Sequence, residues 1–275
     1  MNRGFGFLAL HARAIGAQTE VAARIADLLV DTRWPWAMTL VRPTPMPNTP
    51  VYAWPPGKIP RARLRPIALD VLRSNSALGI HLAASRKDEL NHVFAHVDAG
   101  HAEYTGRAEG TEFPFEARLF CRDEKLPTPN AIDGWVELLH ELVVLLDAPN
   151  AVIFARPDER HIWSLLYGTG SRRPDQPPDH PQNQNARIAG ARRTLGSQWI
   201  RPPEWGTYLA HEHVEKVGRE KLVATAAVAR DIGKLLYLQC SETAADALGT
   251  EALERRQALE ALLAPVCQPG LASDR

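Results

Sequence analysis

The stretch 130–154, NAIDGWVELLHELVVLLDAPNAVIF, decides the fold. In its first part, apolar residues recur three and four positions apart, which predicts a helix that Asn130 caps and that ends near Asp147. Residues 151–154 form a short apolar run that is typical of a buried strand. A strongly amphipathic helix followed at once by a buried strand predicts a sheet covered by helices. The apolar face of the helix comprises Ile132, Trp135, Val136, Leu138, Leu139, Leu142, Val143 and Leu146.

Segments with strand and helix patterns continue on both sides of this stretch. Residues 115–121 largely alternate between apolar and polar side chains, which indicates a half-buried antiparallel strand. The sequence therefore predicts an α+β fold with a mostly antiparallel sheet covered by helices, mainly on one face. Strands are predicted at 5–10, 36–41, 78–83, 90–97, 113–121, 151–154 and 234–240, and helices at 19–30, 62–73, 130–147, 207–217 and 251–263, while 222–229 fits either pattern.

One polar segment interrupts this pattern. Residues 172–187 contain four prolines and several Asn and Gln residues, so they cannot bury apolar area and predict a long polar loop. The loop would separate an α+β body, residues 1–170, from a C-terminal helix–strand–helix part, residues 188–265, packed on the same sheet. A single domain spanning 1–265 is the alternative.

Composition excludes several classes of protein. The chain has 275 residues, with 32 Lys and Arg against 32 Asp and Glu. A net charge of zero argues against a nucleic-acid partner or an anionic membrane partner, because both require a basic surface. The apolar run at 4–10 is too short for a signal peptide, so we interpret it as a strand. Cys121, Cys240 and Cys267 lack paired spacing, which predicts a reducing, cytoplasmic location.

The sequence predicts neither catalytic residues nor a cofactor, since it contains no GxSxG elbow and no phosphate-binding glycine loop. A group of histidines suggests a metal site as the alternative to a protein without catalytic chemistry. His92, His96 and His101 lie near Asp98, and either a helix or a strand would bring some of them to one side, as a metal site requires. Surface histidines beside a turn are the more ordinary interpretation. No metal is therefore assigned.

Two further histidine groups carry no assigned chemistry. His211 and His213 flank Glu212 in a segment with helical spacing, so one is expected in solvent and the other in the core. His140 lies on an apolar helix and is expected to be partly buried and hydrogen-bonded.

Tryptophans and arginines provide candidate contacts for a protein partner. Several tryptophans lie beside prolines, and rigid aromatic or arginine side chains are favoured at protein interfaces. Burial of each tryptophan at the edge of the core is the competing interpretation. The candidate partner-binding residues are Trp34, Trp36, Trp54, Arg61, Arg63, Arg172, Arg173, Trp199, Arg201 and Trp205.

The segment 195–218, LGSQWIRPPEWGTYLAHEHVEKVG, resembles the type VI secretion immunity protein family, a former domain of unknown function. Members carry a tryptophan, a Thr-x-Leu stretch, a helix and a glycine, which here are Trp205, Thr207, Leu209 and Gly218. The later strand at 236–239 and a terminal helix that closes at 263–265 extend the resemblance, which lies mainly within 195–265. The family's second glycine is replaced by Arg219.

This resemblance implies an immunity protein that binds a cognate antibacterial toxin and blocks it. The expected partner is that toxin, and the expected contact is a rigid α+β scaffold that presents aromatic and arginine side chains. Two alternatives stay open: an adaptor or structural subunit of a larger assembly, and a histidine-dependent metal hydrolase that uses His92, His96, His101 and Asp98.

Overall fold

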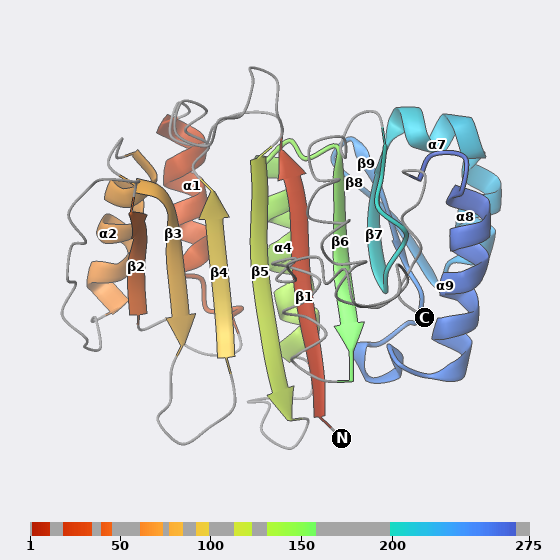
Figure 1. The fold of residues 1–275 in the computed structure, drawn as a ribbon, viewed down its shortest axis with the longest axis horizontal. Helices are drawn as coiled ribbons and strands as arrows, with labels where there is room; N and C mark the ends of the chain where they lie inside the picture. Colours follow the sequence, from red (N-terminus) through yellow and green to blue (C-terminus); the bar gives the residue numbers. More distant parts are fainter. Residues whose placement is uncertain are drawn as a thin grey trace, which may run out of the picture. The chain divides into compact units, whose positions relative to one another are not determined.

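The computed structural model divides the chain into two compact units (Figure 1). The N-terminal unit comprises Ala9–Ala148, and the C-terminal unit comprises Met1–Leu8 together with Pro149–Arg275. The structure describes residues 2–11, 19–34, 40–45, 61–73, 77–84, 92–98, 113–122, 131–157 and 199–267.

The N-terminal unit contains an antiparallel sheet with helices on one of its faces. Its strand order is β2 (Leu40–Pro45), β3 (Ala77–Ala84), β4 (His92–Asp98) and β5 (Phe113–Arg122). Helices α1 (Thr19–Leu29), α2 (Arg61–Arg73) and α4 (Ala131–Leu145) lie together behind these strands in Figure 1. Helix α1 contacts both α2 and α4. The predicted helical layer on one side of a sheet is thus confirmed for this unit.

Helix α4 supplies much of the buried core of the N-terminal unit. Eight of its side chains are buried, including Trp135, which is fully inaccessible. The Trp135 ring lies 6.4 Å from the ring of Trp34, whose indole N–H donates a 2.9 Å hydrogen bond to the Leu28 carbonyl. Each fully buried large apolar side chain contributes about 1.5–3 kcal/mol. The stretch that predicts the fold from sequence is therefore also a main source of its stability.

Among the described residues of the C-terminal unit, the strands follow the order β1-β6-β7-β9-β8, and β1 belongs to this unit up to Leu8. Every residue of β6, β7 and β9 is buried, so these strands are covered on both faces. The β6–β7, β7–β9 and β8–β9 pairings are antiparallel. The elements are β1 (Asn2–His11), β6 (Asn150–Arg156), β7 (Gly206–Ala210), α7 (His211–Val217), α8 (Arg219–Thr225), β8 (Val228–Ile232), β9 (Leu235–Gln239), the 3-10 helix η3 (Ala244–Asp246) and α9 (Thr250–Leu263).

The predicted α+β, mostly antiparallel architecture is confirmed, and one predicted helix is wrong at its start. Residues 206–210 form strand β7, and the helix begins only at His211. The spacing of Leu209, Val214 and Val217 resembles one helical face, but Thr207 and Tyr208 are wholly buried in the sheet, and this burial overrides the local pattern. The ambiguous segment 222–229 divides between the end of α8 and the start of β8.

Several predicted features lie outside the described residues. They include the polar loop 172–187, the proposed boundary between 170 and 188, and residues 36–39 of the second predicted strand. The described part of that strand, β2, begins at Leu40. Within the described ranges, no helix combines the length and apolar character needed to cross a bilayer.

Candidate functional site

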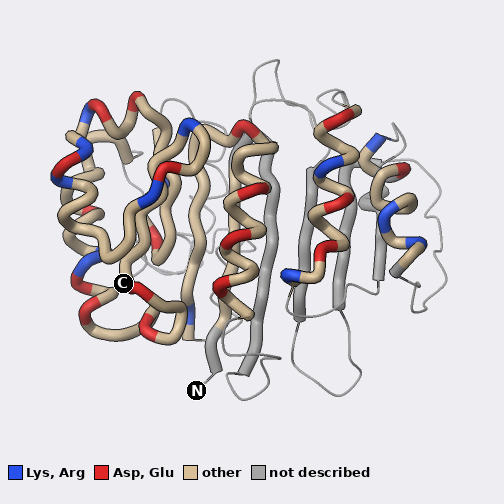
Figure 2. Tube along the Cα trace, turned by 180° about the vertical axis from the view of Figure 1, so that it is seen from behind, with Lys and Arg blue, Asp and Glu red and all other residues tan. Residues whose placement is uncertain are grey.

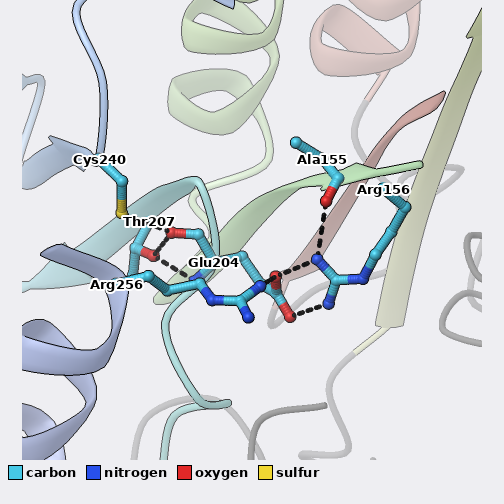
Figure 3. Close-up of polar contacts among 6 residues, drawn as sticks. All are labelled: Ala155, Arg156, Glu204, Thr207, Cys240 and Arg256. Carbon is cyan, nitrogen blue, oxygen red and sulfur yellow. Dashed lines mark hydrogen bonds and ion pairs between the residues drawn. The ribbon is translucent and has the colours of Figure 1, made fainter. Parts of the chain in front are cut away.

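A buried ion-pair cluster lies in the C-terminal unit around Glu204 (Figure 3). Arg156, at the end of β6, donates two 2.8 Å hydrogen bonds to the two carboxylate oxygens of Glu204. Arg256 of α9 approaches the same carboxylate at 3.4 Å. The Arg156 and Glu204 side chains are only 8% and 5% exposed. In this desolvated setting, the bidentate Arg156–Glu204 pair connects β6 to the segment before β7. The contact from Arg256 connects the same carboxylate to α9.

The local backbone holds Glu204 in this position. The Glu204 backbone N–H donates a 3.0 Å hydrogen bond to the Thr207 hydroxyl, which in turn donates to the Glu204 carbonyl at 3.4 Å. Arg201 lies over the Phe154 ring, with its guanidinium carbon 5.1 Å from the ring centre. The buried charges thus serve to connect the Arg-Pro-Pro-Glu-Trp segment to the sheet.

The two cysteine thiols of this unit are poor nucleophiles. Burial raises the pKa of Cys240 to about 12 and that of Cys267 to about 12. Only the thiolate attacks, and at pH 8 about one molecule in ten thousand would carry it at either position. Neither thiol is therefore a candidate for covalent catalysis.

We predict that an alkylating reagent at pH 8 leaves Cys240 and Cys267 unmodified in the folded protein. Both cysteines should react after denaturation, because unfolding returns their pKa toward the ordinary value. Peptide mapping by mass spectrometry measures this residue by residue. Rapid labelling of Cys240 without denaturant would contradict the burial of its thiol.

A polar hollow of about 410 Å³ opens at the start of α9. Glu242, Asp246 and Glu251 contribute three carboxylates to its lining, and Arg255 contributes one guanidinium, which bonds to Glu251. The formal charge of the hollow is therefore −2. Its remaining lining residues are Ser241, Gly249, Thr250 and Ala252.

Hydrogen bonds that start from a buried side chain of the core hold the wall of the hollow in place. The buried Trp205 indole N–H donates a 2.7 Å hydrogen bond to the Ser241 hydroxyl. Ser241 donates to the Thr243 carbonyl at 2.8 Å, and Thr243 donates to the Asp246 carboxylate at 2.6 Å. A preformed, anionic concavity suits a cationic side chain of a protein partner.

Helix α4 of the N-terminal unit carries an acidic stripe on its exposed side (Figure 2). Asp133, Glu137 and Glu141 recur every four residues and are exposed, and the helix contains no Lys or Arg. Glu141 forms an ion pair with Arg33. In the same unit, the Arg65 guanidinium on α2 lowers the pKa of Asp27 on α1 through a hydrogen bond.

The structure corrects the expected exposure of three candidate partner-binding residues. Trp34, Arg201 and Trp205 are only 4%, 4% and 3% exposed. The expectation that they project from Pro-rich connections is wrong, because each packs inside its own unit. The Trp205 ring, for example, meets Phe5 edge-on at 5.5 Å.

The structure describes some of the remaining candidate partner-binding residues and not others. Arg63 is exposed on α2, and Trp199 is half-buried. Arg61 begins α2. Trp36, Trp54, Arg172 and Arg173 lie outside the described residues.

The histidines follow the sequence analysis where the structure describes them. His211 is exposed and His213 is fully buried, as the predicted helix requires. His140 is 5% exposed within the core face of α4. Residues 92–98 form a strand, which settles the choice between helix and strand, whereas His101 lies outside the described ranges. Among side chains the structure describes, no group of three potential ligands could hold a metal.

The Glu204 cluster was not anticipated from the sequence. Arg156 and Glu204 are 48 positions apart, and no local pattern connects them. Two features of the sequence could have indicated the cluster, but only weakly. Arg156 ends an apolar strand, and Glu204 lies between Pro202-Pro203 and Trp205.

Comparison with known proteins finds similarity in structure and no match in sequence. No family model matches the sequence, and no curated protein is significantly similar to it. Among solved structures, the Pseudomonas aeruginosa T6SS protein PA0821 is similar, with a TM-score of 0.57 and 12% sequence identity. The match covers 98% of this chain and 75% of that chain. The two chains share a fold. At this identity, the likeness establishes the fold alone.

Proposed function

We propose that the protein is an immunity protein that binds a cognate antibacterial toxin and blocks it. The observation that carries this proposal is the fold shared with a T6SS protein over nearly the whole chain. No family model matches the chain, so the resemblance of residues 195–265 to the type VI secretion immunity family enters here as part of the proposal.

The polar hollow at the start of α9 is the proposed contact for a basic side chain of the toxin. Three carboxylates against one guanidinium favour a lysine or arginine, and the concave shape removes that cation from water. The bonds from Trp205 to Ser241 and onward to Asp246 hold the wall in place. Such preorganisation lowers the entropic cost of binding.

The direct test is complex formation with the product of the neighbouring gene. The full chain and that protein are co-purified, and their affinity is measured by calorimetry. We expect a stoichiometric complex, and we expect expression of this protein to protect cells from the toxin. Absence of a complex at micromolar concentrations would contradict the proposal.

We predict that Glu242→Lys combined with Glu251→Lys weakens the complex by about tenfold or more, because both substitutions place positive charge against the incoming cation. Calorimetry measures the affinity. The matched control is Glu212→Lys combined with Glu220→Lys, which makes the same change in net charge at exposed positions on α7 and α8. Equal affinities for the two double variants would exclude the hollow as the contact.

An adaptor or structural subunit of a larger assembly is the second candidate. It rests on the same observation, since the similar structure is described only as a T6SS protein. Size-exclusion chromatography of a cell extract separates the two roles. A large multi-subunit complex without any protective effect would favour the adaptor.

A further inference from the structure

Two helices of the N-terminal unit carry opposite charges. Helix α2 contains four arginines and one aspartate, which give it a formal charge of +3. Helix α4 contains three acidic residues and no Lys or Arg, which give it a formal charge of −3. Helix α1 lies between them and contacts both (Figure 2). The helical layer of this unit therefore has a positive edge and a negative edge.

The charged side chains of both edges face solvent. On each helix the apolar residues are turned toward the core, so the charges occupy the outer side of the layer. The exposed charged side chains are Arg63, Arg65, Asp70 and Arg73 on α2, and Asp133, Glu137 and Glu141 on α4.

Two ion pairs within the unit use only part of this charge. Arg65 of α2 pairs with Asp27 of α1, and Glu141 of α4 pairs with Arg33, which follows α1. Each pair cancels one charge of its edge. Helix α2 therefore keeps a surplus of positive charge, and α4 keeps a surplus of negative charge.

A layer that carries both signs in equal amount is complementary to a second copy of itself. A two-fold axis parallel to the helices brings two such layers face to face with the order α2-α1-α4 reversed across the contact. Helix α2 of each copy then lies on α4 of the other, so the attractive pairing occurs twice. The two α1 helices meet at the centre, and each carries both signs.

A partner of a single sign fits this layer less well. A nucleic acid would be attracted by α2 and repelled by α4, and a basic protein would be attracted by α4 and repelled by α2. A second copy meets attraction at both edges. Charge complementarity thus favours self-association over either alternative.

The size of the layer is sufficient for a weak dimer. Helices α2 and α4 have 13 and 15 residues, which corresponds to a length of about 20 Å. Three neighbouring helices span about 25 Å, so the contact would bury about 500 Å² on each copy. A total of about 1,000 Å² is at the lower end of specific interfaces. A small and highly charged contact predicts micromolar affinity that falls as salt rises.

We propose that two copies of the chain associate face to face through the helical layer α2-α1-α4, with α2 of each copy on α4 of the other. The surface belongs to the N-terminal unit, whereas the hollow proposed for the toxin belongs to the C-terminal unit. The proposal therefore does not depend on the toxin and is tested without it.

The test uses the full chain in analytical ultracentrifugation over a range of protein concentrations. We expect a monomer–dimer equilibrium with a micromolar dissociation constant in about 50 mM salt. The dissociation constant should rise by about tenfold or more in about 500 mM salt, because screening weakens contacts between exposed charges.

Charge reversal identifies the surfaces that meet. Arg63→Glu combined with Arg73→Glu makes α2 acidic, and Asp133→Lys combined with Glu137→Lys makes α4 basic. Each pair alone should weaken the dimer by about tenfold or more, because like charges then face each other. The variant with all four substitutions should regain the dimer, because its helices again carry opposite charges. Damage to the fold would not produce this rescue.

The matched control is Glu212→Lys combined with Glu220→Lys, which changes the net charge as the α4 variant does but at exposed positions of the C-terminal unit. Its dimer should match that of the wild type. Thermal melting shows whether each variant is folded, and neutral replacements at the same positions serve where a reversed variant is not.

Three results would overturn the proposal. The first is a wild type that stays monomeric at about 100 μM in low salt, where a micromolar dimer would be largely formed. The second is a dimer that persists in both charge-reversed variants or is lost in the control. The third is failure of the folded four-substitution variant to regain the dimer.

Discussion

Replacing Glu204 by glutamine is expected to lower the free energy of unfolding of the C-terminal unit by about 3–5 kcal/mol. The substitution preserves the size of the side chain but removes the negative charge that faces Arg156 and Arg256. Arg156 is 8% exposed on its side chain, so its charge would stay desolvated without the carboxylate. Buried ion pairs cost much more to break than to replace as a whole.

Urea denaturation monitored by circular dichroism measures this loss, with Glu254→Gln as the control. Glu254 is an exposed acid on α9, and its replacement should change stability by less than about 0.5 kcal/mol. If both glutamine variants unfold at the same urea concentration, the Glu204 cluster does not hold the unit together.

The second large effect is expected in the N-terminal unit, where Trp135→Ala should cost about 3–5 kcal/mol. The Trp135 side chain is fully buried at the centre of the core face of α4 and packs near Trp34. Truncation would leave a cavity that α1 and α4 cannot close without shifting. The measurement is again urea denaturation, read by circular dichroism because the variant loses a fluorophore.

Trp135→Phe provides the matched comparison. Phenylalanine keeps an aromatic ring and removes an indole N–H that has no hydrogen-bond partner in the described part of the structure. The phenylalanine variant should therefore lose less than half as much stability as the alanine variant. Equal losses for the two variants would show that ring packing is not the source of the effect.

The sequence predicted elements best where local pattern and tertiary environment agree. Helix α4 and strand β6 follow this rule. The continuous apolar face of α4 can be buried only as one side of a helix, and the apolar run within β6 is buried as a strand covered on both faces. Strand β7 breaks it: its residues fit a helical stripe, yet they pair with β6 and β9 and are buried on both faces. Long-range pairing decided this segment, and no single-sequence pattern contains that information.

The candidate sites were less predictable than the fold. Trp205 was identified as a notable residue, but its neighbouring prolines suggested exposure, whereas its indole is buried and bonded to Ser241. The carboxylates of the hollow belong to the chain around η3, which carries no recognisable motif.

Strand β1 has a consequence for how the chain acquires its structure. Its first residues belong to the C-terminal unit, where Phe5 meets Trp205, a residue 200 positions later. During synthesis, the ribosome adds Phe5 long before Trp205. The Phe5–Trp205 contact therefore cannot form until the intervening N-terminal unit, Ala9–Ala148, has been synthesised. Contacts this distant in sequence slow folding. Insertion of Phe5 against Trp205 is thus expected among the last events of maturation.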